Sequence, residues 1–391
     1  MMHTPFLLSP LLLAASIGIV VLLAVQLAYL FLVYARVARH AEALNRKNPI
    51  PSDACPPLSV VISAHEAEAD LAECLPAVLE QDYPSYEVIV VNEAADAATD
   101  DLLTRLEAQY PHLYHTFTPP TSRYISRKKL ALTIGIKASR HDWLVLTEAG
   151  CRPASRQWLR TIARHFTPDT DIVLGYSRYA PSHSWFARLA SFMHLFLSMR
   201  YLGMALAGRP YMGLGYNLAY RKSVFFAHKG FSSHLNLLAG DDDLFVHQAA
   251  TRTNTRVEAS AAGVVERKQP SSGRAWRAEL LNRAFTARLS ACGARRLLGL
   301  ETATRLLFLS GSVAVAAYSL HIGAWPMALA SLLLVCIRFA CQAWVFRRTA
   351  TALHERPFCL SLLLWDWIQP FCSACCRLAF LFHRKREFLR R

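Results

Sequence analysis

The chain has 391 residues, of which 53% are hydrophobic, and it carries a formal net charge of +15. This hydrophobic fraction exceeds that of an ordinary soluble domain, so part of the chain is expected to lie in lipid. Much of the basic excess borders apolar runs, where it would meet anionic headgroups. Membrane contact therefore explains the charge, and nucleic acid is not expected as a partner.

The N-terminal segment has the composition of a membrane anchor. Residues 1–35 contain no Lys, Arg, Asp or Glu, and Pro10–Tyr34 is long enough to cross a hydrocarbon core of about 30 Å as a helix. A cleavable signal peptide is the alternative, but its basic region would precede the apolar run, whereas here the basic residues follow it. We expect an anchor over residues 1–35 and a basic linker over residues 36–55.

Two late apolar runs predict a transmembrane hairpin over residues 306–346. They are Leu306–Leu320 and Met327–Phe346, and only a short turn separates them. Basic residues follow the first anchor and flank the hairpin, so the positive-inside rule places the large middle segment in the cytoplasm. Residues 284–305 would then form a juxtamembrane connector.

The last apolar stretch, Pro357–Phe382, contains Asp366 and ends in a basic tail. If the stretch crossed the membrane, that basic tail would face outward, against the positive-inside rule. We therefore expect residues 347–391 to form an interfacial helix and a basic tail.

The middle segment alternates short β-branched runs with helical runs. The runs that predict strands are Leu58–Ile62, Tyr86–Val91, a weaker run near Leu113, Trp143–Thr147 and Asp171–Gly175. The runs that predict helices are Ala69–Glu80, Asp96–Gln109, Arg127–Ser139 and Ala154–Phe166. This alternation indicates an α/β fold with a parallel sheet, whose ligands bind beyond the carboxyl ends of the strands. Trp185–Leu206 is apolar and predicts a helix at the membrane surface, over the site, or in the core.

Residues 56–283 resemble the family 2 glycosyltransferases, in particular a bacterial membrane-anchored branch. The resemblance rests on six segments in a consistent order: Ser59–His65, Glu80–Asn92, Lys128–Gly135, Trp143–Pro153, Tyr211–Ala219 and Gly240–Phe245. It implies a GT-A fold, which is Rossmann-like with a mostly parallel sheet. It also implies a multi-pass protein of the bacterial inner membrane with its catalytic domain in the cytoplasm.

The resemblance implies a nucleoside-diphosphate-sugar as the donor. In the family, a carboxylate after the second strand contacts the nucleoside, and here Glu93 stands at that position. An Asp-x-Asp after the fourth strand holds Mg²⁺ or Mn²⁺ against the diphosphate, and Glu148 matches its first carboxylate. Lys128 or Lys129, at the start of a helix, is expected to meet phosphate through charge and helix dipole.

The chain departs from the family pattern on this donor side. The metal motif reads Glu148-Ala149-Gly150, so one carboxylate is lost and metal binding is expected to be weakened or lost. His65 stands where relatives have Asn after the first strand, and it is equally compatible with a turn residue. The basic-aromatic element of the family is matched loosely by Trp276 and Arg277, which are assigned to donor binding.

The acidic motif of the family is intact as Asp241-Asp242-Asp243. The resemblance assigns Asp242 as the general base that deprotonates the acceptor hydroxyl, and Asp241 to orienting the base or contacting the acceptor. Asp243 completes the catalytic set. The alternative is a solvated turn or an N-cap for a helix over Leu244–Thr251.

Two functions follow from these observations. The first is an inverting glycosyltransferase that moves sugar to a lipid-linked or polysaccharide acceptor at the cytoplasmic membrane face. The second is a catalytically degenerate subunit that binds or scaffolds partners in polysaccharide assembly. The altered Glu93, Glu148 and Gly150 favour the second, whereas the intact acidic motif favours the first.

Overall fold

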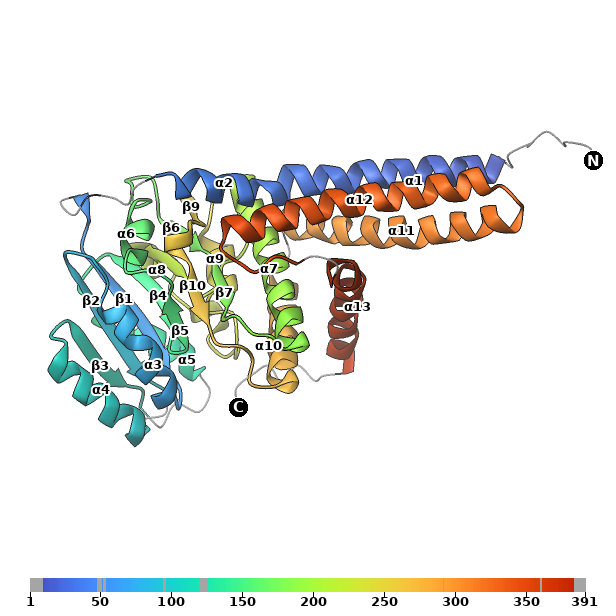
Figure 1. The fold of residues 1–391 in the computed structure, drawn as a ribbon. Coiled ribbons are helices and arrows are strands. Elements are labelled where there is room, and N and C mark those ends of the chain that lie inside the picture. Colours follow the sequence, from blue (N-terminus) through green and yellow to red (C-terminus); the bar gives the residue numbers. More distant parts are fainter. Residues whose placement is uncertain are drawn as a thin grey trace, which may run out of the picture.

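The computed structural model describes residues 10–47, 51, 54–93, 96–119, 126–290, 292–358 and 361–382. An α/β unit lies at one end of the molecule, and a bundle of long helices extends from it (Figure 1). The expected division between a mixed α/β part and apolar helices is therefore confirmed.

The main sheet has seven strands in the order β3-β2-β1-β4-β8-β6-β9. All neighbours are parallel except β8, which runs antiparallel to both β4 and β6. The strands are β1 (Leu58–Ala64), β2 (Tyr86–Asn92), β3 (Leu113–Phe117), β4 (Trp143–Glu148), β6 (Ile172–Gly175), β8 (Leu218–Arg221) and β9 (Thr255–Glu258). Every residue of β1 is buried, as expected for a central parallel strand covered on both faces.

A second sheet of three short strands lies beside the first. Its order is β5-β10-β7, with the strands β5 (Cys151–Pro153), β7 (Ser177–Tyr179) and β10 (Val265–Arg267). The helices of the α/β unit are α3 (Glu68–Leu79), α4 (Ala97–Gln109), α5 (Arg127–Ala138), α6 (Trp158–Ala163), α8 (Lys222–Ala227) and α9 (Asp243–Ala249). Two 3₁₀ turns complete it, η3 (Ser232–His234) and η4 (Ala261–Gly263). Helix α5 packs closely on the sheet, because a Cβ at Gly135 would lie 2.6 Å from Val61 Cγ1.

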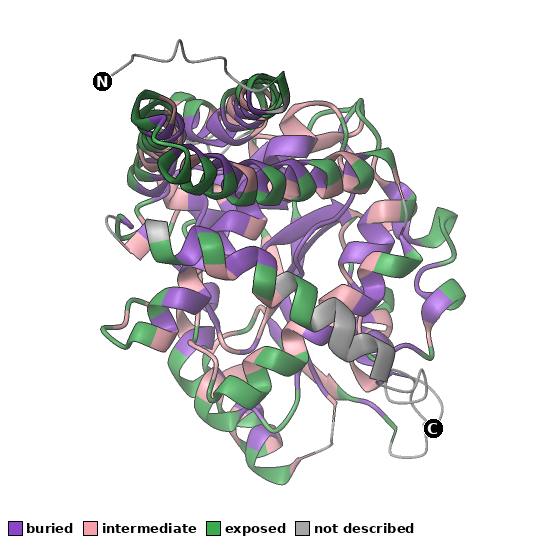
Figure 2. Ribbon diagram, turned by 90° about the vertical axis from the view of Figure 1, so that its right-hand side faces the viewer, coloured by how far each residue is buried: buried purple, intermediate pink, exposed green. Residues whose placement is uncertain are grey.

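The remaining helical elements include the long apolar ones. They are α1 (Pro10–Tyr29), the π-helical turn η1 (Leu30–Tyr34), α2 (Ala35–Asn45), α7 (Trp185–Leu206), α10 (Gly273–Leu289), α11 (Gly293–His321), α12 (Trp325–Ala352) and α13 (Ser361–Phe382). Within the described ranges, four helices are long and apolar enough to cross a membrane: Leu12–Asn45, α7, α11 and α12. Figure 2 shows exposed positions along the long helices. Leu307 and Leu329, for example, are each 59% exposed.

Helix α13 stands crosswise to α11 and α12 (Figure 1) and is fixed to them by buried charge. Asp366 of α13 lies 3.1 Å from Arg305 of α11 and 2.7 Å from Arg338 of α12. It also accepts a hydrogen bond from Gln342 of α12 at 2.8 Å. A buried carboxylate needs such partners, so Asp366 attaches α13 to the bundle rather than facing water.

Most predicted elements are present, with one clear correction. The predicted helix over Ala154–Phe166 is wrong in extent, since α6 covers only Trp158–Ala163. The segment before it is drawn into the second sheet, where β5 pairs antiparallel with β10 and Ala154 N donates to Val264 O. The expected connector over residues 284–305 is largely helical, because α10 ends at Leu289 and α11 begins at Gly293.

Candidate active site

A lysine lies between two carboxylates at the carboxyl end of β4. The Nζ atom of Lys128 is 2.6 Å from Glu148 Oε1 and 2.9 Å from Asp241 Oδ2. Lys128 comes from the first turn of α5, Glu148 ends β4, and Asp241 precedes α9. We call these three residues the lysine cluster. The topology thus brings together residues that lie up to 113 positions apart in the sequence (241 minus 128).

The charges of the lysine cluster stabilise one another. Burial alone would lower the pKa of Lys128, but Asp241 and Glu148 raise that pKa well above its usual range. Burial alone would raise the pKa of Asp241, but Lys128 holds it below the usual value. Lys128 and Asp241 are therefore ionised at neutral pH.

Glu93 and His65 lie at the same edge of the sheet. Glu93 follows β2, and burial raises the pKa of its carboxyl although Lys128 and His65 oppose the shift. His65 follows β1 and is exposed. Glu93 therefore lies within electrostatic reach of Lys128 and Asp241, and His65 lies within electrostatic reach of Glu93.

Lys129 has a different environment from Lys128. Its Nζ atom donates to three backbone carbonyls, those of His234 at 2.6 Å, Leu237 at 3.1 Å and Ala239 at 2.8 Å. Burial lowers the pKa of Lys129 to about 8. The structure thus uses Lys129 to hold the loop that precedes the acidic motif, and it is Lys128 that faces the carboxylates.

The three consecutive acids point to three different partners. Asp241 belongs to the lysine cluster, and Asp242 Oδ2 accepts a hydrogen bond of 2.9 Å from Gly215 N. Asp243 accepts a hydrogen bond from Thr286 Oγ1 on α10. The three neighbouring carboxylates therefore serve three separate sets of contacts.

Asp242 has the acidity expected of a general base. Burial, together with Asp241 and Asp243, raises the pKa of Asp242 to about 7. Its Oδ1 atom also accepts from Asp243 N at 2.6 Å, so it caps α9 as well. A base with a pKa near the working pH accepts a proton efficiently and is still present in its ionised form.

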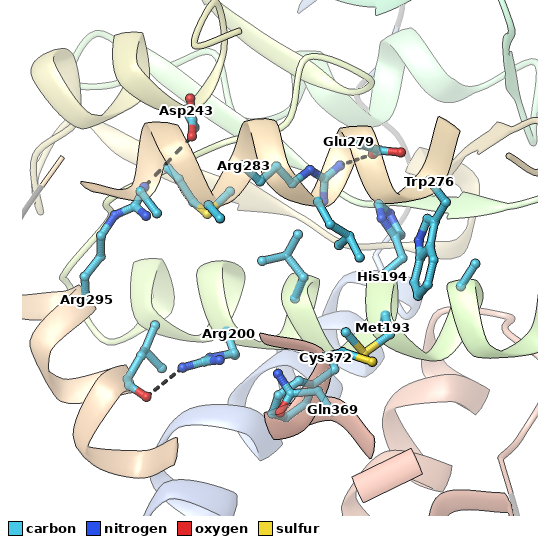
Figure 3. Close-up of a pocket in the computed structure, with 18 of the residues that line it drawn as sticks. Met193, His194, Arg200, Asp243, Trp276, Glu279, Arg283, Arg295, Gln369 and Cys372 are labelled. Carbon is cyan, nitrogen blue, oxygen red and sulfur yellow. Dashed lines mark hydrogen bonds and ion pairs between the residues drawn. The ribbon is translucent and has the colours of Figure 1, made fainter. Parts of the chain in front are cut away.

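A cavity of about 490 Å³ adjoins Asp243. It lies between α7 and α10, with the start of α11 on one side and α13 below (Figure 3). Its wall is mainly apolar, including Met193, Leu197 and Leu280, but Arg200, Arg283 and Arg295 also line it. Helix α7, one of the long apolar helices, thus forms a wall of the cavity, and 13 of its 22 residues are buried.

Helix α10 carries a charged pair at the cavity wall. Glu279 Oε1 accepts from Arg283 at 2.5 Å, Arg267 at 3.0 Å and Tyr216 at 3.0 Å. Burial alone would raise the pKa of Glu279, but Arg283 and Arg267 lower it well below the usual range. Trp276 also lines the cavity, whereas Arg277 is exposed on α10. Trp276 therefore lines the same cavity as Asp243, and its assignment to donor binding stays a prediction.

The residues at the metal motif do not fit a divalent-cation site. Glu148 is the one carboxylate of the motif, and the space beside it is taken by the Lys128 ammonium. A Cβ at Gly150 would lie 3.3 Å from Asp70 Oδ2, but Asp70 is already paired with Lys268 at 2.7 Å. Among the described residues, no group of three or more His, Cys, Asp or Glu could hold a metal. The donor set present here is thus that of an ion-pair cluster.

Several residues of the site were not predicted from the sequence. Arg200, Arg283 and Arg295 come from three separate helices, and Glu279 lies on the same helix as Arg283. One signal was present in the sequence: Trp185–Leu206 carries basic but no acidic residues. Basic groups in an apolar helix need a functional or structural partner.

Comparison with known proteins agrees with this architecture. A family model described as glycosyl transferase family 21 matches residues 19–377. No curated protein matches the chain. Among solved structures, a mannosyltransferase from Pyrobaculum calidifontis in complex with GDP-Man and Mn²⁺ shares the fold, with a TM-score of 0.55 and 18% identity. The match covers 94% of this chain and 99% of that one. The expected glycosyltransferase fold is confirmed, while the matching family is family 21 and not family 2.

Proposed function

We propose that this chain, which belongs to glycosyl transferase family 21 and is a glycosyltransferase, transfers sugar from a nucleoside-diphosphate-sugar to a lipid-linked acceptor. The reaction inverts the anomeric carbon and takes place at the cytoplasmic face of a bacterial inner membrane. Residues 1–35 and 306–346 anchor the chain, residues 56–283 carry the chemistry, and residues 347–391 lie along the membrane surface.

The observation that carries this proposal is the position of Asp242. Lys128, the fixed cation at the edge of the sheet, influences the pKa of Asp242, and the next residue in the chain, Asp243, borders an apolar cavity. We place the donor at that edge and the acceptor in the cavity, so that both approach the Asp242 carboxylate. An apolar cavity walled by long apolar helices favours a lipid-linked acceptor over a soluble glycan.

Asp242 is the general base in this mechanism. The acceptor hydroxyl gives its proton to Asp242, and its oxygen forms a bond to the anomeric carbon from the face opposite the diphosphate. The bond between that carbon and the diphosphate oxygen breaks, and its electron pair leaves on the diphosphate. The hydrogen bond from Gly215 N orients the Asp242 carboxylate for this transfer.

Lys128 supplies positive charge on the donor side. In the family, a divalent cation offsets the charge of the leaving diphosphate, but the donor set here does not fit that ion. Lys128 is held by Glu148 and Asp241, and Glu93 lies near it. We assign Lys128 to the diphosphate and Glu93 to the nucleoside.

The proposal is tested by calorimetric titration of the purified full chain with UDP- and GDP-sugars. We expect at least one of these donors to bind, and we expect Lys128→Gln to weaken that binding. If no donor binds, with or without Mn²⁺, the transferase proposal fails. A degenerate subunit of polysaccharide assembly would then be the better account.

A further inference from the structure

We infer that the cavity between α7 and α10 binds an amphiphile that carries a phosphate group. The apolar wall holds the chain of the amphiphile, and the arginines around Asp243 hold the phosphate. This inference rests on the proposed function in one respect, since it specifies the chemistry of the acceptor. The binding itself can be measured separately from sugar transfer.

The cavity has more positive than negative side chains. Arg200, Arg283, Arg288 and Arg295 line it, against the carboxylates of Asp243 and Glu279. Glu279 is already shared between Arg283 and Arg267. Burial also raises the pKa of Asp243, so this carboxyl offers less negative charge than an exposed aspartate would.

Some of these cations have buried N–H groups without partners. Nε and Nη2 of Arg295, and Nε of Arg200, have no hydrogen-bond partner among the described residues. Within the described ranges, the acid paired with Arg295 is Asp243, with Nη2 and Oδ2 4.0 Å apart, which is too far for a hydrogen bond. Asp243 Oδ1 is likewise buried without a partner in the described part of the chain. Leaving such groups unsatisfied is costly, so a polar ligand is expected between them.

The unpartnered groups of Arg295, Arg200 and Asp243 favour a ligand that is an anion and that also carries O–H groups or a protonatable oxygen. Arg295 and Arg200 donate several N–H groups, which suits a phosphate with its three acceptor oxygens. Asp243 Oδ1 could accept a hydrogen bond from a ligand O–H. Arg200 also lies 3.8 Å from Glu301, so it is the unpartnered N–H groups that call for an anion, and a neutral headgroup with a single hydroxyl would leave several of them without an acceptor.

The position of the cavity suits an amphiphile rather than a free ion. Figure 3 shows Arg295 and Asp243 at one end, and Met193, Trp276 and Cys372 toward the other. Cys372 and Gln369 belong to α13, whose Leu364 and Phe371 are 53% and 58% exposed. The apolar end of the cavity therefore borders a helix with an exposed apolar face, where a lipid chain can enter.

The test uses the full chain in neutral detergent and three probes: decyl phosphate, decanol and inorganic phosphate. Quenching of tryptophan fluorescence reports binding, and Trp276→Phe identifies the part of the signal that comes from the cavity. We expect decyl phosphate to bind about tenfold or more tightly than either decanol or inorganic phosphate. We expect Arg295→Gln to weaken the binding of decyl phosphate by about tenfold, and we expect Arg295→Lys to lose less of this affinity.

Arg296→Gln is the matched control, because Arg296 is the next residue on α11 and is exposed. It should leave decyl phosphate binding within about twofold of the wild type. Thermal unfolding of each variant identifies folding defects, and Arg200→Gln provides a second test if Arg295→Gln does not fold.

Two outcomes would overturn the inference. If decanol binds as tightly as decyl phosphate, the ligand does not need a phosphate, and if inorganic phosphate binds as tightly, the ligand does not need an apolar chain. Donor titration in the same sample keeps a failure here distinct from a failure of the proposed function.

Discussion

The donor and acceptor sides of the site use positive charge in different ways. On the donor side, the Lys128 ammonium is held by two carboxylates at 2.6 and 2.9 Å. On the acceptor side, Arg200 and Arg295 present buried N–H groups that no described residue accepts. Asp242 has a pKa raised to about 7 by burial and by its acidic neighbours, Asp241 and Asp243.

This contrast shows how the site departs from the family pattern without losing its arrangement. Loss of the second carboxylate at Gly150 removes a metal ligand, and the remaining Glu148 pairs with Lys128. The side that we assign to the acceptor keeps its acids, and its cavity contains arginine N–H groups that no described residue accepts. Variants on one side should therefore leave binding on the other side intact.

The largest effect is expected from removal of the base. Asp242→Asn should lower the rate of sugar transfer about 10²- to 10⁴-fold, because no carboxylate is then present to take the proton from the hydroxyl of the sugar acceptor. Binding of the nucleotide donor should change by less than about twofold, since Lys128 and Glu93 remain. Asp169→Asn, on an exposed loop, is the control and should match the wild type. Transfer at the normal rate in Asp242→Asn would show that another group is the base.

Lys128→Gln should weaken binding of the nucleotide donor by about 10- to 100-fold, the usual loss for one charge-assisted contact. Lys137→Gln is the matched control, because Lys137 lies on the same helix and is exposed. Calorimetry measures the affinity for the nucleotide donor, and fluorescence quenching measures the affinity for decyl phosphate in the same samples. If Lys128→Gln weakens both ligands equally, the two sides of the site are not independent.

The rate should depend on pH through Asp242. Because the base must be ionised, transfer should fall about tenfold for each pH unit below about 7. The folded chain also binds this proton more tightly than the unfolded chain, whose carboxyl has an ordinary pKa of 3.8. The free energy of unfolding should therefore decrease as the pH rises from about 4 to about 7, and Asp242→Asn should reduce this decrease. Rate profiles and thermal unfolding across this range test both statements.

The smallest effect is expected from Gly150→Asp alone. The new side chain would meet Asp70 Oδ2 at 3.3 Å from its Cβ, and Lys128 would still pair with Glu148. Mn²⁺ affinity should thus change by less than about threefold. The double variant Gly150→Asp with Lys128→Ala should gain Mn²⁺ affinity, measured by electron paramagnetic resonance. A gain in the single variant would show that Lys128 does not block the metal position.

Much of the fold could be predicted because hydrophobic periodicity reports local structure. The strands at Leu58–Ile62 and Trp143–Thr147 and the helix from Arg127 were predicted close to their observed bounds. The three-residue strands β5, β7 and β10 were missed, since so short a strand depends on pairing with distant residues. Their pairing also shortened the helix predicted over Ala154–Phe166.

The candidate site was predictable where one segment carries it and not where several helices meet. The acidic motif could be found at Asp241–Asp243, but the sequence could not show that its three side chains diverge. The sequence also could not distinguish the role of Lys128 from that of Lys129. The difference arises because Lys129 Nζ donates hydrogen bonds to carbonyls of the His234–Ala239 loop, which is distant in the sequence. The arginine cavity depends on helix packing that no local pattern reports.

The most direct test of this account is a calorimetric titration of the full chain with UDP and GDP after removal of metals by EDTA. If Lys128 provides the cation on the donor side, one nucleotide should bind without metal, and added Mn²⁺ should change its affinity by less than about threefold. Binding that appears only after Mn²⁺ is added would contradict the account, because the donor side would then depend on a metal that Lys128 does not replace.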